Sequence, residues 1–304
     1  MTLRVSMICA CPVSSTEANN SDIPRNMLPI MVDSTTRRSI QSPRVRPARR
    51  IPRRAAGAAL LAAAGLAAAQ AGPGITALGP VRRSLFPRLA GQGAADHVAL
   101  TFDDGPDPAV TPGFLDVLDS RGLHATFFLL GPMVAKAPWL AADIAAAGHE
   151  VGVHGWDHRY LPLRGPRATR DDMTRARDII ASATGRAPAL FRPPYGVLST
   201  AALVTARGLG LAPVLWTCWG REWAPNSTPG SVFRVLAAGL AGGATVLLHD
   251  SDCTSPPGSA RAALGALPLL LDECAGRGLR VGTVAEHGIG QPARPPGGPG
   301  IRPA

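Results

Sequence analysis

Short apolar runs alternate with longer stretches of helical character along the chain from about residue 96. Runs of four to eight apolar residues bounded by Gly, Pro or polar residues are typical of buried parallel strands. Seven segments fit this description: 97–102, 125–130, 150–154, 189–192, 212–217, 245–249 and 279–282. Because strands that alternate with helices form a parallel sheet with the helices outside, we expect an α/β fold. About seven such units predict a distorted (β/α) barrel.

Helix signals occur between these runs. Thr111 and Thr228 each precede a Pro, and a hydroxyl side chain just before a Pro at the first helical position is a start signal. Ser199 has the same capping chemistry and precedes a stretch that ends near Gly208. Apolar residues recur at helical spacing in the segment 171–184, which therefore predicts a helix.

The N-terminal part differs in composition from the rest. Residues 1–54 are polar and basic and predict disorder, with Met27 and Met31 as alternative starts. Residues 55–71 carry no charge, follow an Arg cluster and end in Ala-Gln-Ala, which is the pattern of a signal peptide h-region. An uncleaved membrane anchor is the alternative, because 17 apolar residues reach the lower limit for a spanning helix. Both readings place the remainder outside the cytoplasm, since the Arg cluster stays inside.

The rest of the chain divides by composition. We expect a linker at 72–95, one large domain at 96–290 and a disordered tail rich in Pro and Gly at 291–304. Most of the net charge of +10 lies before the domain, because residues 1–55 hold ten Arg and three acids. The remaining +3 leaves no basic recognition face, so we expect no nucleic-acid partner and membrane contact only through 55–71.

Cysteine spacing bears on metal binding and on disulfides. The five Cys form no C-x-x-C pair, which argues against a zinc site built from cysteines. Cys218 and Cys253 each follow an apolar run and could form a disulfide outside the cytoplasm. Two half-buried thiols are the equal alternative.

Polar side chains gather where the predicted strands stop. In a parallel barrel the carboxyl ends of the strands meet at one rim, and chemistry sits there. The residues concerned are Asp103, Asp104, His154, Arg192, Glu222, His249 and Asp250. The sequence therefore predicts a single polar site at this rim.

The chemistry of these residues is that of a hydrolytic metal site. His154 and His158 are four positions apart, and on a helical turn both rings would face one metal ion. Asp103 and Asp104 are adjacent, so one can bind the metal while the other takes a proton from water that the metal acidifies. His249 can protonate a leaving group. Two His, one carboxylate and an open position fit hydrolysis of an amide or ester.

Five segments in order then resemble the polysaccharide deacetylases with a NodB homology domain, known as carbohydrate esterase family 4. The resemblance covers about residues 96–286 and its implied fold is a distorted (β/α) barrel. The segments are Thr101-Phe102-Asp103-Asp104-Gly105-Pro106, His154-Gly155-Trp156-Asp157-His158, Arg192-Pro193-Pro194-Tyr195-Gly196, residues 216–223 (WTCWGREW) and Val246-Leu247-Leu248-His249-Asp250.

The resemblance implies a role for each matching residue. It implies Asp103 as the base, His249 as the general acid, and Asp104, His154 and His158 as ligands of one divalent metal. Zinc is the first expectation, with cobalt and nickel as alternatives.

Further roles concern orientation and substrate. Arg192 is implied to orient the base, Glu222 to tune His249, and the Tyr195 backbone N–H to hold an oxyanion. Leu247 is implied to line a pocket for the acetyl methyl group. We expect Pro193 and Trp223 to contact substrate. Stacking on sugar rings and packing under the loops are equal readings for Trp223, as they are for Trp156 and Trp219.

Two positions depart from the family pattern. Gly155 stands where the family has Ser or Thr, so a hydroxyl that would brace the metal loop is missing. Glu222 stands where Asp is usual, and its extra methylene could shift His249. Neither change removes a reacting group, so we expect activity.

The expected function is therefore that of a monomeric, metal-dependent hydrolase that removes acetyl groups from N-acetylated sugars of a polysaccharide. Peptidoglycan and chitin-like glycans are the expected substrates, with acetylated xylan left open. A glycan-binding relative with an impaired site, or an amidase or esterase acting on a smaller or O-acetylated substrate, is the alternative.

Overall fold

The computed structural model describes residues 53–289. The predicted disordered segments, 1–54 apart from its last two residues and 291–304, lie outside the described residues. The chain divides into two compact units, Met1–Ala63 and Ala64–Ala304. Of the first unit the structure describes only residues 53–63, which form the beginning of helix α1 (Arg53–Ala71).

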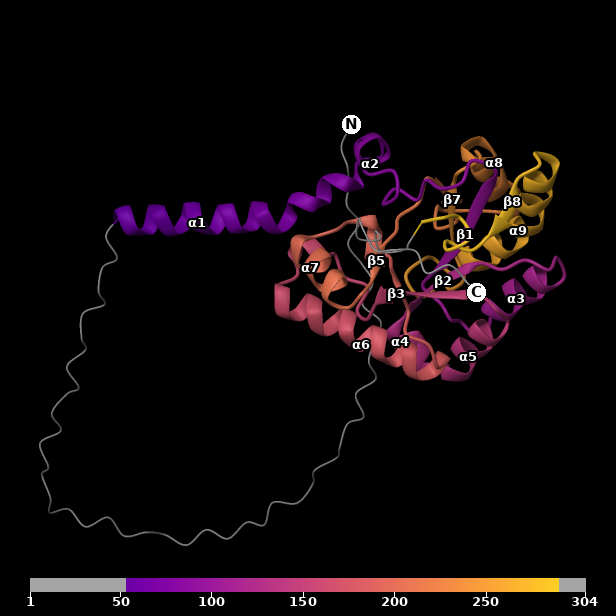
Figure 1. The fold of residues 1–304 in the computed structure, drawn as a ribbon, viewed down its shortest axis with the longest axis horizontal. Helices are drawn as coiled ribbons and strands as arrows, with labels where there is room; N and C mark the ends of the chain where they lie inside the picture. Colours follow the sequence, from indigo (N-terminus) through magenta and orange to yellow (C-terminus); the bar gives the residue numbers. More distant parts are fainter. Residues whose placement is uncertain (1–52, 290–304) are drawn as a thin grey trace, which may run out of the picture. The chain divides into compact units, whose positions relative to one another are not determined.

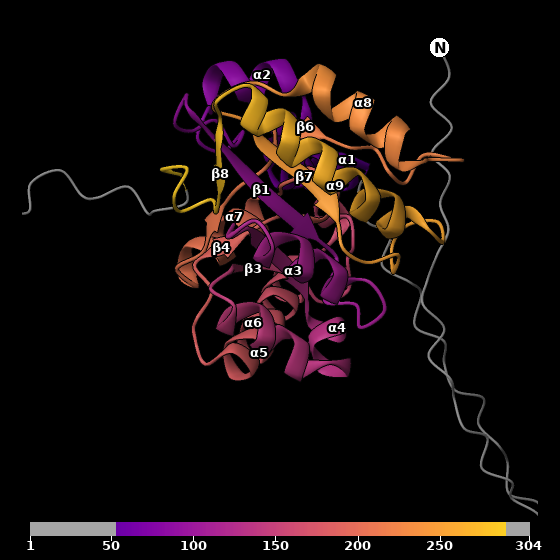
Figure 2. The same ribbon diagram turned by 90° about the vertical axis from the view of Figure 1, so that its right-hand side faces the viewer.

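The core of the second unit is one parallel sheet. Within the described residues it has eight strands, listed here by their bounds: β1 (His97–Asp103), β2 (Thr126–Leu130), β3 (Glu150–Gly155), β4 (Leu190–Phe191), β5 (Ala212–Pro213), β6 (Cys218–Trp219), β7 (Thr245–His249) and β8 (Arg280–Gly282). The spatial order is β5-β4-β3-β2-β1-β7-β6, and β8 pairs with the first residues of β1. The expected distorted (β/α) barrel is confirmed, with β1 at its centre (Figures 1 and 2).

Helices cover the outside of the sheet. After α1 they are α2 (Gly79–Leu85), α3 (Thr111–Asp119), α4 (Gly131–Lys136), α5 (Pro138–Ala146), α6 (Pro166–Thr184), α7 (Thr200–Gly208), α8 (Pro229–Gly239) and α9 (Ser259–Gly276). Helix α6 contacts α4, α5 and α7, and α8 packs on α9. Figure 2 shows these two groups on opposite sides of β1 and β7. Three short 3₁₀ turns are η1 (Gly72–Ala77), η2 (Leu161–Leu163) and η3 (Pro194–Gly196).

Two of the three predicted helix caps form as expected. The Ser199 hydroxyl accepts from Ala202 N–H, and Thr228 forms a capping box with Ser231. The prediction for Thr111 was wrong. Thr111 is the first residue inside α3, and its hydroxyl instead accepts from Asp107 N–H and donates to Asp250 Oδ2, 2.6 Å away.

The predicted strand 212–217 is two short strands joined by irregular chain. Residues 212–213 pair with β4 as β5, whereas 218–219 pair with β7 as β6. Between them Leu215 N–H donates to Leu89 O rather than to a strand. The segment therefore crosses from one edge of the sheet to the other, and a continuous strand could not do this while keeping one set of partners.

The stretch 72–95, expected as a linker, is built into the domain. It contains η1 and α2, and Arg82 is 9% exposed and donates to the Trp216 carbonyl oxygen. The Gly91 carbonyl accepts from the Thr245 hydroxyl, and Ala90 is fully buried. This stretch lacks a periodic apolar pattern because its elements are too short to show one.

Residues 69 and 70, at the end of α1, belong to the second unit and contact other parts of it. The Thr200 hydroxyl donates to Ala69 O, 2.6 Å away, and Gln70 Nε2 donates to Arg164 O, 2.9 Å away. Among residues 61–289, no single helix meets the length and hydropathy of a membrane span, whereas the pair Leu61–Ala77 and Gly79–Leu85, bent by 87°, meets them together.

Candidate metal centre and hydrolytic site

The polar residues predicted for one rim do converge there. Asp103 ends β1 and Asp104 follows it, His154 lies near the end of β3, Arg192 follows β4, and His249 ends β7. Asp103 and His249 are direct partners across neighbouring strands. Because β1 is flanked by β2 and β7, the two aspartates lie at the middle of this rim.

Asp104, His154 and His158 form the one group that could hold a metal ion among the residues the structure describes. Asp104 Oδ1 lies 3.4 Å from His154 Nε2 and 3.5 Å from His158 Nε2. All three donor atoms lie within 4.8 Å of one another. The expected proximity of these three side chains is therefore observed.

The chemistry of the three donors fits a divalent cation. Asp104 Oδ1 is buried and has no hydrogen-bond partner among the described residues. His154 Nδ1 lies 2.8 Å from the Arg192 carbonyl oxygen and must donate to it, so its lone pair is on Nε2, toward Asp104. Burial lowers the pKa of His154 to about 3, which keeps the ring neutral as a metal ligand requires. Two nitrogens and one oxygen match a catalytic rather than a closed structural zinc site.

The second oxygen of Asp104 is held from the other side. The Thr254 hydroxyl donates to Asp104 Oδ2, and Cys253 Sγ lies 3.5 Å from the Asp104 carbonyl oxygen. Thr254 thus leaves Oδ1 as the oxygen that faces both histidines. Sequence reasoning missed Thr254, because it lies in the loop after β7 with no pattern that marks it.

The two histidines do not lie on a helical turn, so that part of the prediction was wrong. His154 is in β3, and the chain leaves the strand at Gly155, which has φ of 98°, to reach His158 in a loop. His158 itself has φ of 47°, an uncommon conformation for a residue with a side chain. The sharp turn at the strand end, and not helical spacing, places the centroids of the two imidazole rings 5.1 Å apart.

Asp103 is fixed by a buried arginine. Arg192 is fully buried, and its Nη1 donates to Asp103 Oδ1 at 2.8 Å and to the Thr101 hydroxyl at 2.7 Å. Its other nitrogens donate to the carbonyl oxygens of Val214 and Leu215, in the irregular segment between β5 and β6. Burial raises the pKa of Asp103, and the charge of Arg192 opposes this rise. Arg192 therefore orients the carboxylate and stabilises its charged form.

His249 is paired with a buried glutamate. Its Nδ1 donates to Glu222 Oε1 at 2.7 Å, and its Nε2 lies 4.0 Å from Asp104 Oδ2. Burial disfavours the charged ring, but the charge and hydrogen bond of Glu222, together with the charges of Asp104 and Asp103, outweigh burial and raise the pKa of His249 to about 9. The Trp223 ring stands edge-on to the His249 ring, with centroids 5.4 Å apart. Glu222 thus favours the protonated ring, whose Nε2 faces the metal group.

The other predicted site residues surround these groups. The Tyr195 side chain is 61% exposed, and its ring centroid lies 4.7 Å from that of His158. Leu247 is buried in a small cluster with Leu215 and Trp216. Pro193 is buried directly after Arg192, and Trp223 is half-buried. All the predicted residues therefore lie in or beside one rim of the sheet.

The structure does not pair Cys218 with Cys253. Cys218 Sγ lies within 3.5 Å of the Leu236 carbonyl oxygen under α8, whereas Cys253 is at the metal centre.

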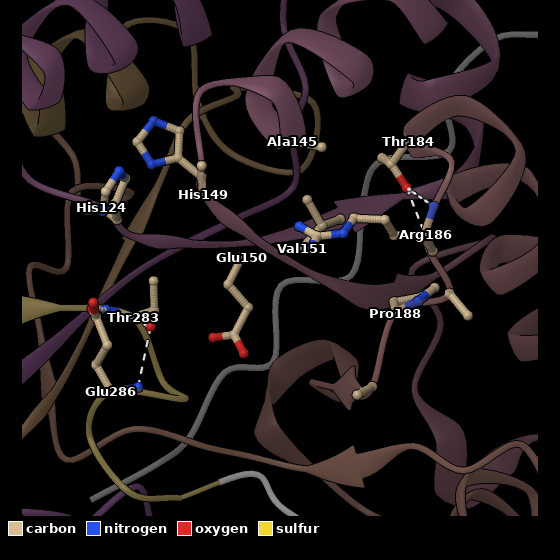
Figure 3. Close-up of a pocket in the computed structure, with 13 residues that line it drawn as sticks. His124, Ala145, His149, Glu150, Val151, Thr184, Arg186, Pro188, Thr283 and Glu286 are labelled. Atoms are coloured by element: carbon tan, nitrogen blue, oxygen red, sulfur yellow. Dashed lines mark hydrogen bonds between the residues drawn. The ribbon is translucent and has the colours of Figure 1, made fainter. Parts of the chain in front are cut away.

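A cavity of about 330 Å³ lies at the opposite ends of the strands. It is lined by residues at the start of β3 and in the turn after α6, including His149, Glu150 and Arg186. Figure 3 shows the Glu150 side chain extending into it. None of the predicted site residues lines this cavity, which is therefore separate from the rim.

Comparison with known proteins identifies the family of this chain. Residues 90–214 match the family model described as "Polysaccharide deacetylase". A "Chitooligosaccharide deacetylase" of Bradyrhizobium sp. (strain ANU 289) is 42% identical over 170 residues, which cover 56% of this chain and 76% of the relative. A "Peptidoglycan-N-acetylglucosamine deacetylase" of Bacillus cereus is 35% identical over 193 residues, which cover 62% of this chain and 86% of the relative.

A solved structure gives the same result. The family 4 carbohydrate esterase from Streptomyces lividans, in complex with acetate, superposes with a TM-score of 0.55 and is 31% identical. The match covers 62% of this chain and 93% of that one. With the relatives covered over most of their length, the chain belongs to the polysaccharide deacetylase family.

Proposed function

We propose that the chain is a metal-dependent deacetylase that hydrolyses the N-acetyl groups of a polysaccharide, namely peptidoglycan or a chitin-like glycan. One observation carries the proposal. A buried carboxylate, Asp103, and an imidazole, His249, are partners on neighbouring strands and flank a group fit for a metal. The relatives named for chitooligosaccharides and for peptidoglycan N-acetylglucosamine support this substrate class.

Asp104, His154 and His158 would hold one divalent ion, zinc in the first instance and cobalt or nickel as alternatives. When bound, the ion supplies Lewis acidity that polarises the acetyl carbonyl and makes water more acidic. The Thr254 hydroxyl, which donates to Asp104 Oδ2, orients Asp104 before any ion binds. The Arg192 carbonyl oxygen, which accepts from His154 Nδ1, does the same for His154. The ligand set is therefore largely preformed.

Asp103 acts as the general base. Arg192 holds Oδ1, which leaves Oδ2 directed to the metal side, 3.8 Å from His154 Nε2. From there it takes one proton of the attacking water as the new carbon–oxygen bond forms. The raised pKa that burial gives Asp103 makes the carboxylate a stronger base.

His249 acts as the general acid. The carbon–nitrogen bond breaks as His249 Nε2 donates its proton to the departing sugar nitrogen, which leaves acetate and a free amine. Glu222 keeps the ring oriented through Nδ1 and stabilises its protonated form. The backbone N–H of Tyr195 would stabilise the oxyanion, and Leu247 would line the pocket for the acetyl methyl group. Pro193 and Trp223 would contact the sugar.

We further propose that the enzyme works outside the cytoplasm as a monomer held to the membrane by residues 55–71. The uncharged run after the Arg cluster supports export. The contacts of Ala69 and Gln70 with the domain support retention of the segment, because cleavage after Ala71 would remove both. Membrane fractionation with N-terminal sequencing tests this, and a soluble protein that begins at residue 72 would contradict it.

Acetate release from defined glycans tests the proposed activity. The panel contains N-acetylated chitooligomers, peptidoglycan and O-acetylated xylan, each with zinc-loaded enzyme, metal-free enzyme and Asp103→Asn. We expect acetate from an N-acetylated substrate with the loaded enzyme, and a rate about 10²–10⁴-fold lower for Asp103→Asn. Acetate from xylan alone would replace the proposal by an esterase, and acetate from none would reject it.

A further inference from the structure

A buried carboxylate outside the metal group is bonded to the loop that carries His158. Asp172 lies on α6 and is 6% exposed. Its Oδ2 accepts from Trp156 N–H and its Oδ1 from Asp157 N–H, each at 2.9 Å. These two amides lie between the ligands His154 and His158 in the chain, so one carboxylate fixes the segment that joins them.

The backbone of this loop offers a site for an anion. The backbone at Gly155 and at His158 has positive φ, and two successive amides point to the same side, toward Asp172. Consecutive amides that converge form a concave site for an anion. Hydrogen bonds to a charged acceptor are stronger than those between neutral groups, so the two bonds to Asp172 help to hold His158 in its uncommon conformation.

Two arginines complete the arrangement. Arg164 Nη1 lies 3.3 Å from Asp172 Oδ1 and donates to Asp157 Oδ2 at 2.8 Å, which balances the buried charge. The guanidinium carbon of Arg175 lies 3.5 Å from the centre of the Trp156 ring. The loop is therefore held by its amides, by one side-chain charge and by its indole ring.

The position of the carboxylate also accounts for Gly155. A Cβ atom at residue 155 would lie 3.0 Å from Asp172 Oδ2, closer than ordinary contact. The carboxylate thus occupies the space beside residue 155, where a hydroxyl side chain would brace the loop in the family pattern. An Asp at this point in α6 takes over that bracing role from the helix.

We infer that Asp172 is a positioning residue that sets His158 for metal binding. It touches neither the metal group nor the substrate and acts through the backbone of residues 156 and 157. The inference rests on the proposed metal-dependent function, and it predicts that the charge of Asp172 determines metal affinity.

Zinc affinity, measured by competition with a chromophoric chelator, tests the inference. The variants are Asp172→Ala and Asp172→Asn, and Asp171→Asn is the matched control because Asp171 is the exposed neighbour on the same helix. We expect zinc affinity to fall about 10–100-fold for Asp172→Ala, less for Asp172→Asn, and not at all for the control. The cobalt-loaded Asp172 variants should also show a changed d–d absorption spectrum, which a loss of global stability alone would not cause.

Wild-type zinc affinity in both Asp172 variants would overturn the inference. If Asp172→Ala does not fold, as judged by circular dichroism of the metal-free protein, Asp172→Asn decides alone by the same criterion. Acetate release by the wild-type enzyme is scored separately. A wild type that binds zinc but releases no acetate rejects the proposed function, whereas unchanged zinc affinity in the variants rejects the role of Asp172.

Discussion

His249 Nδ1 lies 2.7 Å from Oε1 of Glu222, a side chain that is fully buried. The longer side chain at residue 222 therefore still reaches the imidazole. Because Glu222 makes the largest contribution that raises the pKa of His249, to about 9, its charge strongly affects the pH range over which the ring can donate a proton.

Replacement of Glu222 should change the pH dependence of the reaction. A general acid is active below its pKa, so activity falls as the pH rises through that value. Glu222→Gln removes the charge that raises the pKa of His249, and the alkaline limb of kcat/KM should move to lower pH. Glu222→Asp keeps the charge and should shift it less. An alkaline limb that is identical in wild type and Glu222→Gln would contradict this assignment.

The two histidines on opposite sides of the centre should separate metal binding from proton transfer. His158→Ala removes a ligand, so we expect loss of stoichiometric zinc binding together with loss of activity. His249→Ala leaves the ligands in place, so zinc binding should persist while the deacetylation rate falls about 10²–10⁴-fold. Zinc content after dialysis and acetate release measure the two effects. Equal loss of zinc in both variants would place His249 among the ligands instead.

Arg192 should be essential for stability as well as for activity. Its removal leaves the Asp103 carboxylate buried without its partner, which in comparable pairs costs about 3–5 kcal/mol. We expect Arg192→Met to lower the free energy of unfolding by that amount in guanidinium titrations of the metal-free protein. Arg186→Met removes an exposed arginine and should change it by less than about 0.5 kcal/mol. Similar values for the two variants would show that the buried pair adds little.

Stability should fall with pH through a histidine far from the metal centre. Burial lowers the pKa of His149 to about 4, whereas the unfolded chain takes up a proton near 6.5. Between these values the unfolded state binds more protons, so stability is full above pH 6.5 and declines as the pH falls toward 4. His149→Gln should flatten this decline in thermal melts of the metal-free protein. An unchanged slope would exclude His149 as its source.

The sequence predicted the strands that are buried along their whole length. β1 and β2 are buried at every position, so their apolar runs are continuous and their bounds are nearly correct. The division of this segment into β5 and β6 was not predictable, because residues 212–213 and 218–219 pair with different strands. No local sequence pattern indicates which strand a residue will pair with. The sequence predicts a linker around Arg82 because a buried arginine in a short helix cannot be told from an exposed one by sequence pattern.

The candidate site was predictable where it depends on strand ends. Asp104, His154 and His249 meet because parallel strands end at one rim, which follows from topology alone. Thr254 and Asp172 meet the same site through a loop and a helix, and their positions depend on how these pack. For Asp172 a signal was present, since a charged residue interrupts the buried stripe of α6 beside Met173.

The central place of β1 has a consequence for how the protein matures. The Thr101 hydroxyl donates to Val246 O, a partner 145 residues away, and this pairing brings the proposed base and acid together. Closing so long a loop costs entropy that only the finished sheet offsets, and distant pairings of this kind slow folding. A nascent chain that ends before β7 lacks His249, the proposed acid. Such a chain also lacks Thr254, which holds Asp104, so the proposed base, acid and metal group are complete only after β7 has paired with β1.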